Sequence, residues 1–376
     1  TNGTGTTFTI PTDGTHQVKV KQSNSNPEPT VTDAVEIIID TAAPIVQFVS
    51  ADSDKAVQTI SVNYSEDLDP AFLPTAGDYD ISQNGNPLTV SSVALDAEDN
   101  SMLVLSIQEA FNPGAMNFTY TASSDANELV TDLAGNQLDQ GFTQMIVSAG
   151  AGYIRGAQVY IDANGDGIAQ DSELREEVTS DEFGQIILTD EFLNAEENTD
   201  ADGNPYQVIV KGGINVDSGA PNEIELTAPA GYSVINPLST LVQEMASSFD
   251  GDSAAAEQAL KDSLGITTVG GLGSYDPQSD TNVANRVVAT QIATVLAVAA
   301  TADSSSTDDE EAPTALSSLA DIVSSNENNS ETVSLDSATI SAVLSEVVDD
   351  DQLDIISEAV DAMEAVKNSD DSDAAF

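Results

Sequence analysis

The segment Asp162–Glu173 constrains the fold of this chain more than any other stretch of its sequence. Oxygen-bearing side chains stand at positions 1, 3, 5 and 12 of this twelve-residue segment, and glycine stands at position 6. This spacing is typical of a calcium loop, in which the glycine allows a sharp turn and the last carboxylate closes the coordination shell. The predicted ligands, in chain order, are Asp162, Asn164, Asp166, Ile168 through its carbonyl oxygen, Gln170 and Glu173. The alternative is an Asp/Asn/Gly turn that holds no metal.

The residues before this loop favour a strand and not a helix. Tyr153–Ile161 alternates between apolar and polar side chains and is rich in β-branched and aromatic residues. We therefore expect a calcium loop between strands of an extracellular β domain, and not the helix pair of a cytosolic calcium sensor.

The charge of the chain excludes several classes of partner. There are 64 Asp and Glu against nine Lys and Arg, which gives a formal net charge of -55. The acids are spread along the chain, with 20 in residues 1–149, 17 in 150–235 and 27 in 236–376. Without a basic patch, binding to nucleic acid or to anionic lipid is not expected. Cation binding is the natural consequence of this composition.

Cysteine and tryptophan are both absent from the chain. Disulfides and thiolate metal sites are therefore excluded, and Ca²⁺ is the cofactor that could stabilise a secreted protein in their place. We accordingly expect an extracellular location, on a cell surface or secreted. The most apolar run, 287–300, is too short to span a bilayer and predicts a buried helix, so membrane insertion is not expected.

Residues 1–43 contain three strand-like runs, which are too few for a sandwich core. They are predicted to be either part of a truncated immunoglobulin-like domain or strands donated to another sheet. The run from Ile39 to Pro44 resembles the joint between tandem immunoglobulin-like repeats of bacterial surface adhesins. That resemblance implies that Asp40 helps to hold a bridging calcium; the alternative is a plain linker.

Residues 44–148 predict an antiparallel β-sandwich, because short alternating segments recur between turn signals. The motifs Ser65–Pro70, Asp78–Ile81 and Val130–Asn136 resemble, in their order, the immunoglobulin-like repeats of large bacterial surface proteins, including those of the SwmB type. The last motif is first of all a turn, and calcium ligation by its Asp132 is the secondary interpretation.

Residues 149–235 predict the calcium-loop β module. Its order of strand, calcium-type loop, Thr-x-Asp-x-x-Gly and strand resembles prealbumin-like or CnaB-like modules of bacterial surface proteins. The motifs around 156–167, 212–219 and 228–241 resemble a module of giant RTX-type adhesins and cadherin-like proteins. A second acidic cluster with Asp200 and Asp202 copies half of a calcium loop, and a weaker calcium site and an Asx-rich turn are both open.

Residues 236–367 change to helical periodicity and predict five or six helices. Asn236 is expected to cap the first helix, Pro237 to occupy its first position, and Gly265 to end the second helix. The tail 368–376 is predicted to be disordered. The whole chain is thus expected to be multidomain, with all-β sandwich units, a calcium-binding β module and an α-helical domain.

No catalytic residue is predicted, and the only histidine, His16, is expected on a strand of the first 43 residues. The leading hypothesis is a non-catalytic, calcium-stabilised segment of a bacterial extracellular adhesin. Its expected partners are neighbouring domains of the same surface protein and a peptide or glycan ligand. One alternative is a self-associating subunit of a surface layer or filament. The other is a carbohydrate-active enzyme with accessory β modules.

Overall fold

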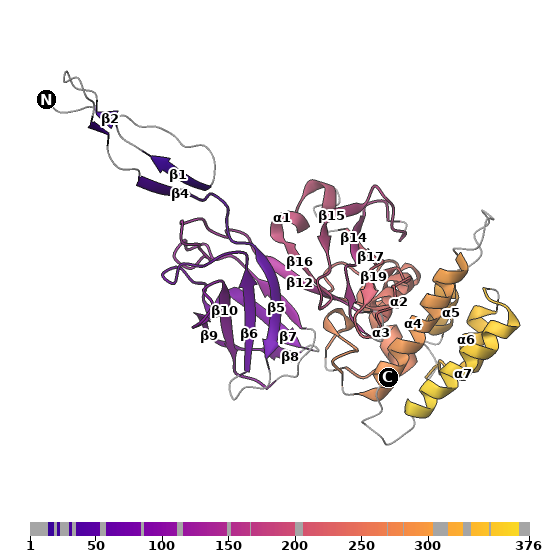
Figure 1. Cartoon of the computed structure of the whole chain (residues 1–376). Coiled ribbons are helices and arrows are strands. Elements are labelled where there is room, and N and C mark those ends of the chain that lie inside the picture. Colours follow the sequence, from indigo (N-terminus) through magenta and orange to yellow (C-terminus); the bar gives the residue numbers. More distant parts are fainter. Residues whose placement is uncertain are drawn as a thin grey trace.

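The computed structural model shows a row of β-structure that ends in a group of helices (Figure 1). The residues that it describes are 14–18, 21–22, 30–31, 35–52, 58–83, 86–110, 116–148, 152–165, 167–199, 206–268, 270–280, 282–303, 315–325, 332–345 and 347–367. The predicted disordered tail, 368–376, lies outside these residues, as do most of residues 1–34.

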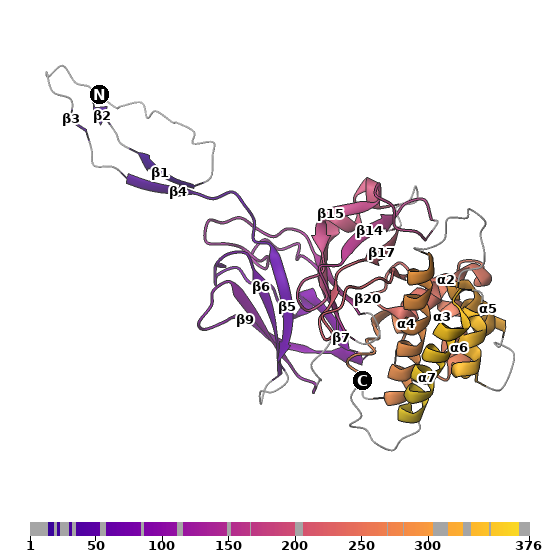
Figure 2. The ribbon, with the colours of Figure 1, turned by 45° about the vertical axis from the view of Figure 1, so that its right-hand side comes forward.

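Two short pairs of strands precede the first large unit (Figure 2). Strand β1 (Gly14–Val18) pairs antiparallel with β4 (Val35–Ile39), and β2 (Lys21–Gln22) pairs with β3 (Thr30–Val31). Each pair forms its own two-stranded sheet in the described part of the chain. His16 lies on β1, opposite Ile37, as the strand prediction requires.

A β-sandwich follows, and its two sheets enclose one apolar core. The first sheet has the strand order β5-β6-β10-β9, and the second has the order β16-β12-β11-β7-β8. The strands that belong to residues 46–147 are β5 (Val46–Asp52), β6 (Gln58–Tyr64), β7 (Tyr79–Gln83), β8 (Asn86–Leu88), β9 (Val90–Leu95), β10 (Met102–Ile107), β11 (Asn117–Tyr120) and β12 (Phe142–Val147).

Alternation along these strands builds the core of the sandwich. On β6 and β10, every second side chain is buried, which is the two-residue period of a strand with one face inward. The second sheet contributes four rings, Tyr79, Phe118, Tyr120 and Phe142, whose centroids lie 5.3 to 5.8 Å apart in the pairs in contact. Contacts of this geometry add to the stabilisation that burial of the rings provides.

The sandwich is joined to the following region through β12. Strand β16 (Gln185–Thr189) pairs antiparallel with β12, and β20 (Val234–Ile235) pairs parallel with the end of β12. Gln185 also reaches the first sheet, because its side-chain amide donates to the Val49 carbonyl and accepts from the Val49 N–H at 2.5 and 3.1 Å. The regions 44–148 and 149–235 therefore share one sheet.

A separate four-stranded sheet, with the order β15-β14-β17-β19, carries the predicted calcium loop. Its strands are β14 (Gln158–Asp162), β15 (Leu174–Thr179), β17 (Gln207–Lys211) and β19 (Leu226–Ala228). Strands β13 (Ile154–Arg155) and β18 (Ile214–Asn215) form a small two-stranded sheet beside it. One short helix, α1 (Asp190–Leu193), follows β16.

Six further helices complete the described chain. They are α2 (Pro237–Ala246), α3 (Ser253–Leu264), α4 (Val283–Asp303), α5 (Ala315–Ser325), α6 (Ser337–Leu344) and α7 (Asp350–Lys367). Asn236 caps α2 by accepting from the N–H groups of Leu238 and Ser239, and Gly265 ends α3 in the left-handed conformation. The predicted capping signals are confirmed.

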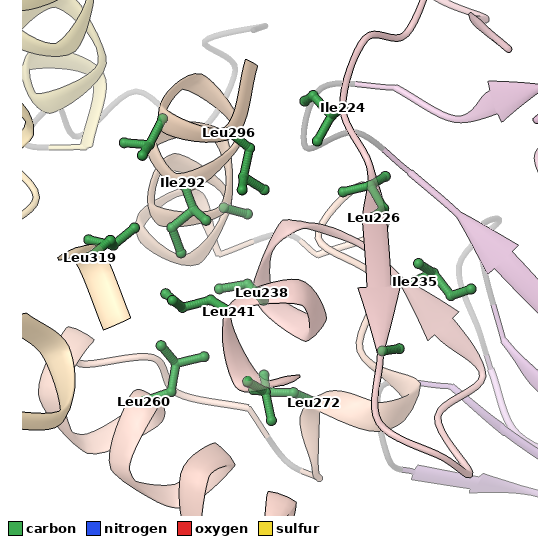
Figure 3. Close-up of a cluster of buried hydrophobic side chains, with 14 of the residues drawn as sticks. Ile224, Leu226, Ile235, Leu238, Leu241, Leu260, Leu272, Ile292, Leu296 and Leu319 are labelled. Carbon is green, nitrogen blue, oxygen red and sulfur yellow. The ribbon is translucent and has the colours of Figure 1, made fainter. Parts of the chain in front are cut away.

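The helices and the β module are packed around a common core. Figure 3 shows side chains of α2, α3, α4 and α5 meeting those of β19 and β20, among them Leu226, Ile235, Leu241 and Ile292. Each of these four side chains is completely buried. The predicted regions 149–235 and 236–367 thus contribute to a single hydrophobic cluster.

Helix α4 is longer than the apolar run that predicts it. Its 21 residues include the window Val283–Ala300, which by length and composition alone could cross a membrane. The prediction that this apolar segment is too short to span a bilayer is therefore wrong, because α4 extends beyond residues 287–300 at both ends. Half of that window is buried inside the protein, and Val287, Ile292 and Val295 are completely covered, so α4 serves as a core helix in this fold.

Strand and helix placement agrees closely with the sequence periodicity. The mixed architecture of β-sheets followed by helices is confirmed, and the described part of residues 236–367 contains six α-helices, where five or six helices were predicted. Strands β7 and β8 are additions that the sequence analysis did not predict.

The bridge between Gln185 and Val49 gives a test of how tightly the two sheets are joined. We expect Gln185→Ala to lower the free energy of unfolding by about 1 to 3 kcal/mol, because it leaves the N–H and C=O groups of Val49 without these partners. Urea denaturation measures this change. The exposed Gln108→Ala serves as the control and should cost less than about 0.5 kcal/mol. Equal effects of the two variants would contradict the bridge.

A second prediction concerns Glu244 on α2. Burial, and then the negative charge of Asp321 on α5, raise the pKa of its carboxyl. The folded chain therefore binds this proton more tightly than the unfolded chain, and stability falls as pH rises from the ordinary carboxyl pKa through the raised value. We expect Glu244→Gln to stabilise the protein at pH 7 and to lose this advantage in acid. Thermal melting against pH, with the exposed Glu358→Gln as control, measures it; equal gains for both variants would refute it.

Candidate cation sites

Three carboxylates meet where the chain passes from β4 into the sandwich. Asp40 directly follows β4, Glu66 lies two residues after β6, and Asp132 lies in the turn after residue 131. One oxygen from each side chain lies within 4.8 Å of the oxygens of the other two. We call Asp40, Glu66 and Asp132 the joint cluster.

Backbone contacts bring these three segments together. Residues 68 and 132 form a bridge between the turn of Glu66 and the turn of Asp132, and the Asp69 N–H donates to the Thr131 carbonyl at 2.8 Å. The linker is tied in on the other side, because the Ser65 N–H donates to the Ile45 carbonyl at 2.8 Å. The cluster is thus a product of the sandwich fold and of the linker path.

Asp132 is the buried member, with 1% of its surface exposed. One of its oxygens, Oδ1, accepts from the N–H groups of Ala134 and Asn136, each at 2.8 Å. The other, Oδ2, accepts from the Asn136 side chain at 2.7 Å. That same amide donates to the carbonyl of Asp40 at 3.2 Å. Asn136 therefore fixes the turn and the linker together.

The pKa shifts of Asp132 and Glu66 in the joint cluster have opposite directions. Burial raises the pKa of Asp132, but the hydrogen bonds from Asn136, Gly135 and Ala134 outweigh it and hold the pKa below its ordinary value. For Glu66, burial and then the charges of Asp132 and Asp40 raise the pKa. Neither of the two ion pairs in the described part of the chain involves the cluster. A bound cation would relieve this repulsion.

The spacing of the cluster fits a calcium ion. Calcium takes six to eight oxygen ligands at about 2.3 to 2.6 Å, so two oxygens on opposite sides of the ion are about 4.6 to 5.2 Å apart. The three carboxylate oxygens fall within this limit. In the described part of the chain this is the one group of three or more acidic or histidine side chains at such a distance.

The twelve-residue loop joins two strands, as its flanking residues predict. Asp162 ends β14, and β15 begins directly after Glu173. Gly165 and Gly167 both have φ +74°, in the left-handed region that glycine adopts without strain. The loop is closed at its base, where the Ile161 N–H donates to the Glu173 carbonyl at 3.0 Å.

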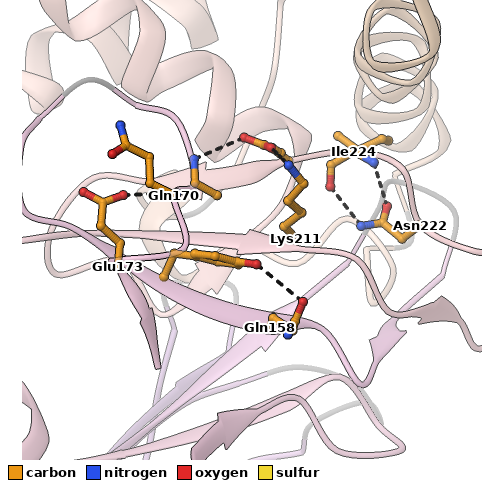
Figure 4. Close-up of polar contacts among 9 residues, drawn as sticks. Gln158, Gln170, Glu173, Lys211, Asn222 and Ile224 are labelled. Carbon is orange, nitrogen blue, oxygen red and sulfur yellow. Dashed lines mark hydrogen bonds and ion pairs between the residues drawn. The ribbon is translucent and has the colours of Figure 1, made fainter. Parts of the chain in front are cut away.

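Both terminal acids of the loop are buried and accept hydrogen bonds from its backbone. Figure 4 shows Glu173 with the hydrogen bond that it accepts from Gln170. The two oxygens of Asp162 accept from the N–H groups of Gly165 and Gly167 at 2.8 and 3.0 Å. Those of Glu173 accept from the N–H groups of Ala163 and Gln170 at 3.2 and 3.3 Å. The two carboxylates therefore shape the loop from its two ends.

Among the other predicted ligands, Asn164 and Ile168 are exposed and Gln170 is half-buried. Asp166 lies outside the described residues, as do Asp200 and Asp202 of the second acidic segment. At the loop the structure therefore describes two acidic side chains, Asp162 and Glu173. Calcium binding there stays a prediction from the spacing of the sequence.

Two acids at these sites were missed by the sequence analysis. Glu66 was noticed within a motif of the sandwich but was not proposed as a ligand. Glu225, which precedes β19, accepts from the N–H of Ala169 in the loop at 3.4 Å and forms an ion pair with Lys211 of β17 (Figure 4). For both Glu66 and Glu225, the only signal in the sequence was an acidic residue close to the end of a strand.

Comparisons of this chain with protein-family models, with curated proteins and with solved structures give no match. Function is therefore inferred from the joint cluster and the loop.

Asn136 provides a test of how the joint is held in the absence of a cation. We expect Asn136→Ala to lower the free energy of unfolding by about 1 to 3 kcal/mol, because a buried carboxylate and the Asp40 carbonyl each lose a donor. Chemical denaturation in a chelator measures it. The matched control is Asn127→Ala, which removes a similar bond to Asp125 in an exposed turn. A loss no larger than that of the control would contradict the assignment.

Proposed function

We propose that this protein is a non-catalytic, calcium-stabilised segment of a bacterial extracellular adhesin. The observation that supports the proposal best is the joint cluster, because its three carboxylates come from the linker and from two turns of the sandwich. A cation bound there would connect the linker to the sandwich directly.

Calcium suits this cluster better than a transition metal. The cluster offers only carboxylate oxygens, which are hard ligands that favour calcium or magnesium over zinc or copper. The calcium-type spacing of the loop Asp162–Glu173 points to the same ion. Both sites would then respond to the millimolar calcium of an extracellular medium.

The mechanical consequence follows from the position of Asp40. With an ion shared by Asp40, Glu66 and Asp132, the linker is held at a fixed angle to the sandwich, and the segment becomes a stiff extender. At about ten times the dissociation constant, one site adds about 1.4 kcal/mol to the stability of the folded state. Repulsion among the three acids favours a looser joint when the ion is removed.

The wider assignment rests on the architecture and on the resemblances in the sequence. The sandwich of residues 44–148 is proposed to be immunoglobulin-like, and the sheet that carries the loop to be of the prealbumin or CnaB type. Neighbouring domains of the same surface protein are the proposed partners at the β1–β4 end. A cell-surface or secreted location agrees with the acidic, cysteine-free composition.

A second function, a self-assembling filament or surface-layer subunit, is favoured by one observation. In the described part of the chain, β1 and β4 pair only with each other, and a two-stranded sheet of this kind can take up a further strand at an edge. Size-exclusion chromatography distinguishes the two functions: polymers support assembly, and an elongated monomer supports the adhesin segment.

Thermal melting with calcium or with a chelator tests the proposal. We expect calcium at about ten times its dissociation constant to raise the midpoint by about 3 to 6 °C per site. The variant Asp132→Asn should lose the part that arises at the joint, and Glu173→Gln the part that arises at the loop. The double variant should show no shift.

The control is Asp125→Asn, which removes one exposed turn carboxylate and should keep the full shift. A wild-type midpoint that is the same in calcium and in chelator would refute calcium as a structural ion. Loss of the shift in the control variant would instead assign the effect to net charge.

A further inference from the structure

A cavity of about 240 Å³ lies at the seam between the sandwich and the region that follows it. One wall is the outer face of the sheet that contains β11 and β12. Phe118 and Tyr120 of β11 are buried in the sandwich core, so Asn117 and Thr119 face the opposite way. Strands β14 and β17, helix α1, the residues Asn198 and Tyr206, and the segment after β19 provide the remaining walls.

The described residues that line this cavity carry no charge. None of the seventeen described residues that line it is acidic or basic, although about one residue in six of the whole chain is acidic. Three aromatic residues, Phe192, Tyr206 and Tyr232, contribute to the lining. A cavity with these walls suits a neutral ligand with an apolar surface.

Neutral polar groups lie on the wall formed by the sheet. The Thr119 and Thr143 hydroxyls are 3.3 Å apart, and one hydrogen bond between them leaves acceptor capacity on both oxygens. In the described part of the chain, the Asn117 amide and the Tyr206 hydroxyl have no hydrogen-bond partner. A ligand with several hydroxyl groups could use all four side chains.

We propose that this cavity binds one neutral sugar ring, such as the terminal residue of a glycan. A pyranose has an apolar C–H face for the aromatic rings and hydroxyl groups for the amide and hydroxyl side chains. The size of the cavity also suits a single sugar ring, because the cavity is smaller than the roughly 300 to 1,000 Å³ of pockets for drug-sized ligands.

The structure argues against other occupants. An anionic or cationic ligand would find no opposite charge among the described lining residues. A peptide strand needs an open sheet edge, whereas this wall is the face of a sheet whose strands β11 and β12 are paired. Cleavage of a glycosidic bond needs two carboxyl groups, and none is among the described residues that line the cavity, so the proposed activity is binding alone.

The test is saturation-transfer difference NMR and calorimetry on the calcium-loaded full chain. The probes are glucose, galactose, mannose and N-acetylglucosamine, with glucuronate and N-acetylphenylalanine amide for comparison. We expect one or more of the neutral sugars to bind with a dissociation constant on the order of 1 mM, as befits about twelve non-hydrogen atoms. Glucuronate and the amino-acid derivative should bind more weakly or not at all.

Variants of the lining residues complete the test. Asn117→Ala and Tyr206→Leu should each weaken sugar binding about tenfold, because each removes one hydrogen-bonding group or one ring. The matched control is Asn63→Ala, which changes a half-buried asparagine on the outer face of the other sheet. Circular dichroism and melting curves verify that each variant is folded.

Three outcomes would overturn the inference: binding of none of the neutral sugars, tighter binding of the phenylalanine derivative, or equal losses in Asn117→Ala and Asn63→Ala. The cavity shares no residue with the joint cluster or the loop. If no sugar binds, the calcium proposal is unaffected. If a sugar binds but calcium does not change the melting midpoint, the sugar proposal is supported and the calcium proposal is refuted.

Discussion

The pairing of β12 is the interaction on which the rest of the structure depends. Its two faces belong to different cores, because Phe142 packs inside the sandwich while Met145 and Val147 pack against the helical side. Its two edges are also occupied, by β16 on one side and by β11, with β20 following it along the strand, on the other. A strand that is covered on both faces and paired on both edges cannot be displaced without opening both cores. The sandwich and the region after it therefore behave as one body, and a force applied to either is carried through β12.

Much of the fold was predictable because its signals are local. Asn236, Pro237 and Gly265 mark helix ends through their own backbone chemistry, and the helices lie where these residues place them. Two of the strands that were not predicted, β7 and β8, have weak local signals. Strand β7 alternates correctly but carries Asp80 and Ser82, and β8 contains Pro87, which all disfavour strands. Tertiary pairing with β11 makes β7 a strand despite its composition. The shared sheet was not predictable, since pairing between distant strands leaves no periodic mark in the sequence.

The two candidate cation sites also differ in whether their signals are local in the sequence. The loop Asp162–Glu173 is one continuous segment, so its spacing alone marked its ligands. The joint cluster is assembled from three segments, which backbone contacts such as the bridge between residues 68 and 132 bring together. Asp40 and Asp132 were candidates because each belongs to a recognisable turn or joint, whereas Glu66 became a candidate only through its distance to them. Sequence reasoning therefore identifies a candidate site that lies in one turn and misses a candidate ligand that only the tertiary structure brings close.

The hydrogen bonding of the two sites indicates where a cation would have the larger structural effect. In the loop, each oxygen of Asp162 and Glu173 already accepts from a backbone N–H, so the loop keeps its shape through its own amides. At the joint, Asp132 is similarly satisfied, but in the described part of the chain no N–H donates to Glu66, and its neighbours are two further acids. A cation at the loop would thus bind to a shape that is already formed. At the joint it would replace the repulsion between the three carboxylates with attraction, so calcium would control the angle of the linker more than the fold of either unit.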